Sequence, residues 1–187
     1  MEQQLKKQID RVVELTPEEF SVVLEHFTVK TFKKRQYVFR KGERVDYAYY
    51  VGQGLLKLIH TDDMAREYIV SFAMEDWWES DFMAYFDRGT ASMSLKCLEE
   101  TVVLCLSLDN YRKLRKEVPK MERFLLEKSN RGFIASQQRI LSLMTLSAKE
   151  RYDQLLAQYP SLLQRVSKTQ LASYLGVSRE TLSRLSS

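Results

Sequence analysis

The sequence has little cysteine, histidine or proline, and this scarcity excludes several kinds of site. Of its 187 residues, two are Cys, two are His and three are Pro. Cys97 and Cys105 do not form a CxxC pair and His26 and His60 lie far apart, so we expect buried thiols in strands and no metal site. Neither a nucleophile motif nor a glycine-rich phosphate loop accompanies these histidines, so we do not expect an enzyme.

A long apolar run is also missing. No stretch of the sequence approaches the roughly 18 consecutive apolar residues that a membrane span needs. The first ten residues, MEQQLKKQID, are polar and do not have the pattern of a secretory signal. The composition, 44% hydrophobic and 29% charged, is typical of a globular protein. We therefore expect a cytoplasmic protein that has no membrane partner.

The charge, in contrast, is distributed very unevenly. Residues 1–110 contain 14 Lys/Arg and 19 Asp/Glu, which gives 14 − 19 = −5. Of the 29 Lys/Arg and 25 Asp/Glu in the whole chain, residues 111–187 hold the remaining 15 and 6, which gives +9. Basic charge concentrated at one end indicates a C-terminal part that binds a polyanion.

The spacing of apolar residues changes along the chain. Residues 1–26 have helical spacing and include a capping box, "TPEE", at residues 16–19. Between residues 28 and 106, short alternating runs are separated by turn residues, which predicts an antiparallel barrel or sandwich. An aromatic and acidic stretch at residues 75–90 interrupts these strands, and we expect a short helix and a loop there.

Helical spacing returns after residue 106 and includes one long segment. Residues 119–145 have no proline inside the helical pattern. Such a helix exceeds the needs of a small domain, and its apolar face favours packing against a second copy of the chain, with burial in its own chain as the alternative. The apolar positions assigned to this dimer interface are Met121, Phe124, Leu125, Phe133, Ile134, Ile140 and Leu141.

The C-terminal end contains two short capped helices separated by a glycine. Ser167 opens a capping box with Gln170, Gly176 stands where a tight turn needs positive φ, and Ser178 caps the second helix. This pattern is typical of a helix-turn-helix, and residues 148–159 supply the third helix that its core requires.

Charged residues occupy the first turn of the last helix, residues 178–185. In a helix-turn-helix this end of the recognition helix enters the major groove, which places Arg179 and Glu180 at the base edges and Arg184 one turn further. Arginine can bridge O6 and N7 of guanine, and glutamate can accept from N4 of cytosine. The alternative is a solvated set of surface ion pairs. Candidates for phosphate contacts, which position the helices without reading sequence, are Ser167, Lys168, Thr169, Ser173 and Ser183.

With this order of elements, the chain resembles the Crp/Fnr family of bacterial transcription regulators. The likeness covers almost the whole chain, and its most specific part is "VSRETLSR", residues 177–184, which is similar to the family's recognition helix S-R-E-T-[LV]-x-R. The resemblance implies that Arg179, Glu180 and Arg184 read a G-T-G-A half-site in double-stranded DNA. It also implies a jelly-roll sensor similar to cyclic-nucleotide-binding domains, and RNA polymerase as a further partner.

The sensor half departs from the family's pattern. Members that bind cyclic nucleotides carry Gly-Glu and then Arg-Ser or Arg-Thr, whereas Ser80-Asp81 and Ala91-Ser92 stand at the corresponding positions here. Because Ala91 cannot supply the guanidinium that neutralises the phosphate, we do not expect cAMP as a ligand. The motifs of the iron–sulfur and haem sensors are absent too, so no cofactor is assigned. The candidate effector pocket comprises Ser80, Asp81, Phe82, Arg88, Ala91 and Ser92, where Arg88 could substitute for the missing arginine.

An aromatic group in the same stretch has two possible explanations. It could line an apolar effector site, or it could fill a core that takes no effector. Its members are Trp77, Trp78, Phe82, Tyr85 and Phe86.

Together these patterns predict an α+β protein with three parts. An antiparallel β-roll sensor occupies residues 1–118, a dimerisation helix residues 119–145 and a helix-turn-helix domain residues 146–187. The expected function is homodimeric, sequence-specific regulation of transcription, in which an effector shifts the long helix and a hinge at residues 145–147. The alternative is a small-molecule-binding module whose helical tail contacts another protein. Because family members often continue into a wing or longer helix after the motif, we expect either a shortened DNA-binding domain or a further tail.

Overall fold

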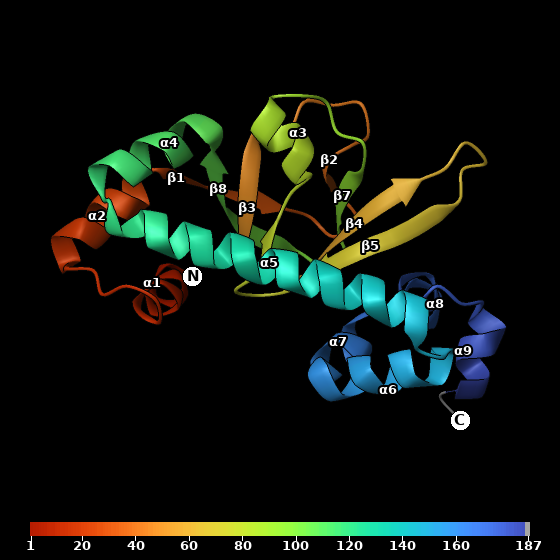
Figure 1. Ribbon diagram of the computed structural model, residues 1–187. Helices are drawn as coiled ribbons and strands as arrows, with labels where there is room; N and C mark the ends of the chain where they lie inside the picture. The colour runs from red at the N-terminus through yellow and green to blue at the C-terminus, as the bar shows by residue number, and fades with distance from the viewer. Residues whose placement is uncertain (186–187) are drawn as a thin grey trace.

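The computed structural model describes residues 1–185. It shows a β-roll that is joined through one long helix to a bundle of short helices (Figure 1). The α+β class predicted from the sequence is confirmed. The prediction of a wing or tail after the motif concerns residues that lie outside the described part.

The elements of the first part alternate between helices that cover the roll and strands that build it. In chain order they are α1 (Glu2–Asp10), α2 (Pro17–Glu25), β1 (Phe27–Phe32), β2 (Tyr37–Phe39), β3 (Tyr47–Gln53), β4 (Leu56–Thr61), β5 (Glu67–Ala73), β6 (Trp78–Glu79), α3 (Phe82–Asp87), β7 (Ser94–Cys97), β8 (Thr101–Ser107) and α4 (Leu108–Glu117). The remaining elements are helices: α5 (Lys120–Thr145), α6 (Ala148–Gln158), α7 (Pro160–Arg165), α8 (Lys168–Leu175) and α9 (Arg179–Leu185).

Two four-stranded antiparallel sheets form the roll, with strand orders β1-β8-β3-β6 and β2-β7-β4-β5. The central strand β8 has a nearly continuous apolar sequence because it pairs with β1 and β3 and is buried along most of its length. Cys97 and Cys105 are buried free thiols in β7 and β8, as predicted, and burial raises the pKa of each to about 11.

The long helix α5 changes its environment along its length. Its first turns pack with α1, α4 and the roll, and they bury Met121, Phe124 and Leu125. These three residues therefore do not belong to an exposed interface, and the prediction that assigned them to one is wrong. Helical spacing identifies an apolar face but does not show that the N-terminal helices of the same chain cover its first part.

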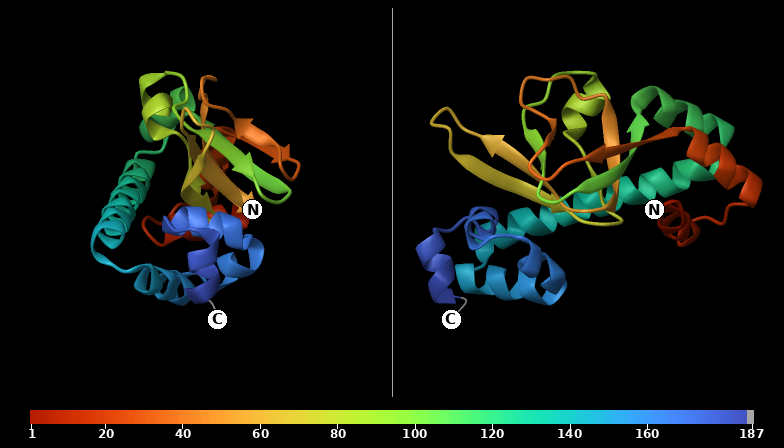
Figure 2. Two further views of the ribbon diagram at one scale, coloured as in Figure 1. Left: turned by 90° about the vertical axis from the view of Figure 1, so that its right-hand side faces the viewer. Right: turned by 180° about the vertical axis from the view of Figure 1, so that it is seen from behind.

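Beyond these turns, α5 extends from the N-terminal helices to the C-terminal bundle, which lies below the β4–β5 end of the roll (Figures 1 and 2). Within residues 1–185, no helix is both long and apolar enough to cross a membrane.

Candidate functional site

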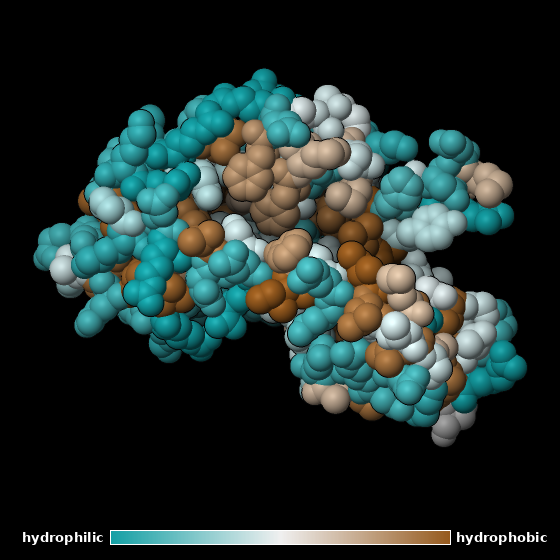
Figure 3. Space-filling view, in the orientation of Figure 1, coloured by the Kyte–Doolittle hydropathy of each residue, from teal (hydrophilic) through white to brown (hydrophobic). Residues whose placement is uncertain are grey.

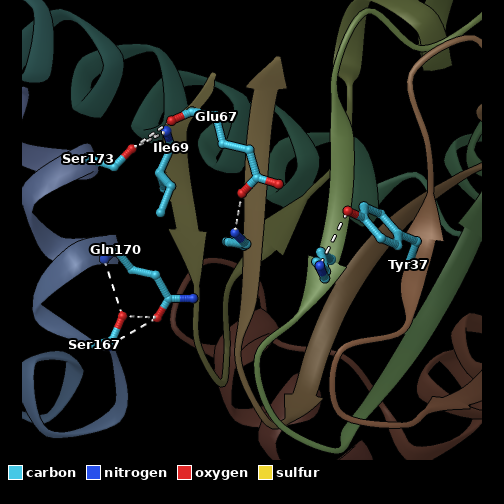
Figure 4. Close-up of polar contacts among 8 residues, drawn as sticks. Tyr37, Glu67, Ile69, Ser167, Gln170 and Ser173 are labelled. Carbon is cyan, nitrogen blue, oxygen red and sulfur yellow. Dashed lines mark hydrogen bonds and ion pairs between the residues drawn. The ribbon is translucent and has the colours of Figure 1, made fainter. Parts of the chain in front are cut away.

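The helix-turn-helix predicted from the sequence is formed by α8 and α9. The Ser167 hydroxyl accepts from Gln170 N, while the Gln170 side chain accepts from Ser167 N at 3.0 Å (Figure 4). Gly176 ends α8 in the left-handed region at φ 68°, and Ser178 accepts from Thr181 N at 3.1 Å to cap α9. These local devices fix where α8 ends and where α9 begins.

Packing and hydrogen bonds hold this pair of helices in place. The third helix expected from the sequence is present as α6, followed by α7, and these contribute Leu155 and Leu162 to a buried cluster with Leu171, Leu175 and Leu182 of the motif. Arg151 on α6 donates to the backbone oxygens of Leu175 at 3.1 Å and Leu146 at 2.7 Å, thereby connecting the end of α8 to the end of α5. The arginine supplies donors to carbonyl groups that the helix ends leave unpaired.

The three predicted base readers lie on α9, and all are exposed. Arg179 and Glu180 are in its first turn, and Arg184 is in its last. The pKa of the Glu180 carboxyl lies below its ordinary value because its own backbone N–H and the Ser178 hydroxyl stabilise the anion. The first turn of α9 therefore presents a cation and an ionised carboxylate to solvent.

The predicted phosphate contacts divide into two groups. Ser167, Lys168 and Thr169 are exposed at the start of α8, and Ser183 is half-buried on α9. Ser173 instead contacts the roll: its hydroxyl accepts from Ile69 N at 3.2 Å and donates to Glu67 O at 3.1 Å (Figure 4). Ser173 therefore contacts β5, and its prediction as a phosphate contact is wrong. The position of a residue in a helix does not show which side of that helix faces the roll.

The centre of the predicted effector pocket is a buried carboxylate. Asp81 is fully buried, and its Oδ2 accepts from Ser92 N and Ser92 Oγ at 2.8 Å and from Met93 N at 3.2 Å. Its Oδ1 accepts from Ala84 N at 3.2 Å, which caps α3. Asp81 therefore provides an internal hydrogen-bond acceptor for donors in the segment that the family resemblance assigns to a cyclic phosphate.

Other members of the predicted pocket do not converge on Asp81. Ala91 is buried nearby, but the Ser80 hydroxyl donates to Tyr47 O, and Phe82 is 43% exposed. Arg88 pairs with Asp109 at the surface, so it does not replace the missing arginine as the sequence suggested. Arg88 has a left-handed backbone conformation, φ 54°, and ends α3.

The aromatic group also separates into different environments. Trp77 meets Tyr159 of α6–α7 edge-on at 5.1 Å between ring centroids, whereas Trp78 packs against Tyr50 and Phe124. Tyr85 is buried, and Phe86 is 44% exposed beside it. These side chains therefore do not line one shared cavity, and most of them fill existing cores.

A further sequence-predicted surface lies on the second half of α5. Phe133, Ile134, Ile140 and Leu141 are each at least half-exposed. Brown, hydrophobic surface is visible along this part of the molecule (Figure 3). The interface assigned from the sequence did not include Leu126, Leu143 and Met144, whose side chains are also exposed. Leu126, Phe133 and Ile140 recur every seven residues, a spacing that could have indicated one continuous stripe.

Comparisons with known proteins agree with this architecture. The family model "Cyclic nucleotide-binding domain" matches residues 29–117. The transcriptional activator protein Anr of Pseudomonas protegens is 26% identical over 167 residues, covering 83% of this chain and 68% of Anr.

Two solved structures have the same fold. The regulator CLP of Xanthomonas campestris, described as c-di-GMP responsive, has a TM-score of 0.73 at 18% identity, with 91% of this chain and 89% of CLP covered. The Thermus thermophilus catabolite activator protein has a TM-score of 0.59 at 25% identity, with 91% and 82% covered. The matched sensor domain, the similarity to Anr and the shared architecture support the resemblance of this chain to the Crp/Fnr family of transcription regulators.

Proposed function

We propose that the protein is a homodimeric, sequence-specific DNA-binding regulator of transcription. The observation that carries this proposal is the exposed first turn of α9, where Arg179 and Glu180 project from a capped helix-turn-helix. A carboxylate that faces DNA is electrostatically unfavourable, and it is explained best as a specificity element that accepts from cytosine N4. RNA polymerase is the proposed protein partner of the DNA-bound regulator.

The apolar stripe on α5 supports pairing with a second copy of the chain. Phe133 is 64% exposed, and a Cβ atom placed on the neighbouring Gly132 would meet no atom within 4 Å. Exposed apolar side chains beside a small residue allow two helices to approach closely along a seven-residue repeat. A symmetric dimer then presents two α9 helices to a palindrome whose half-sites lie about 34 Å apart.

The pocket supports a sensor that does not take a cyclic nucleotide. A cyclic phosphate in this segment would find Ser92 N and Ser92 Oγ already hydrogen-bonded to the buried side chain of Asp81. Ala91 offers no compensating cation. We propose that regulation of this protein does not depend on cAMP.

Duplex binding tests the main proposal. Fluorescence anisotropy compares a G-T-G-A palindrome with a scrambled duplex between 50 and 200 mM salt, roughly the range over which phosphate contacts weaken strongly. We expect a preference for the palindrome of about a thousand-fold or more. Equal binding of both duplexes would refute sequence-specific recognition and favour a helical tail that contacts protein.

Sedimentation tests the dimer separately. Phe133→Glu introduces a charge into the apolar stripe, so we expect it to shift the protein from dimer to monomer and to remove the advantage of a palindrome over one half-site. Arg88→Gln, at a surface pair away from α5, serves as the control. A wild-type monomer, or a Phe133→Glu dimer of unchanged stability, would contradict the proposed interface.

A further inference from the structure

Strand β5 is the edge of its sheet, and side chains from the C-terminal half of the protein cover that edge. The Ser173 hydroxyl pairs with Ile69 N and Glu67 O, and Arg139 Nη2 on α5 lies 3.4 Å from Ile69 O. These contacts satisfy backbone groups that an edge strand leaves unpaired. The helix α8 therefore docks on β5 through the strand's own backbone (Figure 4).

Apolar contacts accompany these hydrogen bonds between β5 and α8. Ile69 and Phe72 of β5 belong to the same buried cluster as Leu171 and Leu175 of α8. The rings of Phe72 and Tyr174 have centroids 5.1 Å apart. Burial of this shared layer excludes water from the contact and stabilises one relative orientation of the two surfaces.

Arg139 connects three elements at this contact. Its guanidinium lies 3.7 Å from the centroid of the Tyr174 ring and donates to Tyr174 O at 2.8 Å, in addition to its contact with Ile69 O. Stacking on an aromatic ring and fixed donor directions are properties that lysine does not reproduce. One side chain thus connects the long helix α5 to both α8 and β5.

A second arginine fixes the bundle at a different point. Arg165 at the end of α7 forms paired contacts with Glu75, at 2.8 and 2.9 Å, and with Glu99, at 3.0 and 2.7 Å. Glu75 follows β5, and Glu99 lies in the turn between β7 and β8. The Arg165 side chain is 23% exposed, so these bidentate pairs are partly shielded from solvent.

The residues that contact β5 and the proposed base readers are different residues. Ser173 is turned onto β5, whereas Arg179, Glu180 and Arg184 are all exposed. Docking therefore leaves the base readers accessible while it restricts rotation of α8 and α9 relative to the roll.

We infer that docking on the edge of β5 sets the orientation in which the reading helices meet DNA, with Ser173, Arg139 and Arg165 as positioning residues. The inference rests on the proposed function. The contact between α8 and β5 connects the roll directly to the helix-turn-helix, in addition to the connection through residues 145–147. In a dimer, two helix-turn-helix units held in this way have a defined separation. The contact between α8 and β5 therefore determines which half-site spacing is preferred.

The experiment measures affinity for a series of palindromes in which the spacer is shortened or lengthened by up to three base pairs. The test variant is the double change Glu75→Gln/Glu99→Gln, which removes the charges opposite Arg165 but keeps similar side-chain shapes. Ser173→Ala is the second variant, and Arg88→Gln is the matched control, since it removes a charge pair on the opposite part of the roll.

We expect wild type and the control to bind one spacing about ten-fold more tightly than its neighbours, and both dock variants to reduce this ratio to about two-fold. The base preference at each half-site and the salt slope should stay unchanged, because α9 itself is intact. In Ser173→Ala, amide hydrogen exchange at Ile69 should also accelerate, since its acceptor is lost.

The possible outcomes separate this inference from the proposed function. If wild type shows no preference for a palindrome at any spacing, the proposed function fails. If wild type selects one spacing and both dock variants retain the same ratio, the positioning inference is overturned. A dock variant that loses base preference and thermal stability together also overturns it, because the contact then supports folding as a whole.

Discussion

The recognition helix α9 and the predicted effector pocket differ in whether their polar side chains are available to a partner. On α9, Arg179 and Glu180 face solvent, and their charges are available to a partner. In the pocket, Asp81 is fully buried and its carboxylate is bonded to Ser92, Met93 and Ala84. The availability of hydrogen-bonding groups, more than their presence, therefore distinguishes a surface that binds a partner from a segment whose polar groups are already hydrogen-bonded to one another.

The largest expected effect tests whether Asp81 is structural. Asp81→Ala leaves several buried donors without an acceptor, so we expect a loss of about 3–5 kcal/mol in the free energy of unfolding. Urea unfolding measures this loss. Asp87→Ala, on the exposed end of α3, is the control and should change stability little. If Asp81→Ala were as stable as wild type and bound cAMP, the interpretation of Asp81 as an internal hydrogen-bond acceptor would be wrong.

A second prediction concerns pH and the buried carboxyl of Glu79. Burial raises its pKa from 4.5 to about 7, with bonds to Ser71 and Ser80 N acting in the opposite direction. The folded state then holds a proton that the unfolded state releases, so this group's contribution to stability is complete below pH 4.5 and declines as pH rises through 7. The expected decline is about 3 kcal/mol, since one pKa unit corresponds to roughly 1.4 kcal/mol.

Comparison of unfolding curves between pH 5 and 8 measures this contribution. Glu79→Gln should flatten the decline, whereas Glu100→Gln, at an exposed carboxyl, should not. Identical pH profiles for wild type and Glu79→Gln would contradict the prediction.

The third prediction tests the opposite region, the exposed first turn of α9. Arg179→Ala should reduce specific binding by about 1–3 kcal/mol per half-site and relax discrimination at one base pair. Titration with single-base variants of the palindrome measures both effects. The free energy of unfolding should change by less than about 0.5 kcal/mol, since the side chain is exposed. An unchanged base preference would remove Arg179 from the assigned readers.

The smallest expected effect distinguishes residues that contact phosphates from residues that read bases. Lys168→Ala should weaken specific and scrambled duplexes about equally and lower the salt slope by about one. Anisotropy titrations at several salt concentrations measure the slope. A selective loss for the palindrome would instead indicate that Lys168 contributes to sequence recognition.

The capping and turn residues in the sequence predicted the helix-turn-helix correctly. Ser167 with Gln170 and Gly176 act within a few residues of one another, so their geometry follows from local sequence. The pocket was harder to predict because Asp81 bonds to donors eleven and twelve residues away, and such closure has no periodic signal. The sequence showed the loss of an arginine at Ala91, but it did not show that a carboxylate already bonds the neighbouring donors.

Long-range packing explains the other differences. The apolar spacing of α5 was recognised, yet Met121 and Phe124 are covered by the N-terminal helices, whereas Phe133 is not. In the same way, Ser173 looked like a member of the DNA-facing set because α8 was considered by itself. Which side of a helix is covered depends on elements far away in sequence, and a single sequence gives no direct measure of that contact.

The hydrophobic cluster shared by β5 and α8 has a consequence for how the chain acquires its structure. Ile69 and Phe72 are synthesised about one hundred residues before Leu171 and Leu175. On the ribosome, the C-terminal helices therefore emerge when the sheet that completes their core has already left the exit tunnel. A fragment that begins at α6 lacks those partners, and we expect it to be less ordered than the same helices in the intact chain.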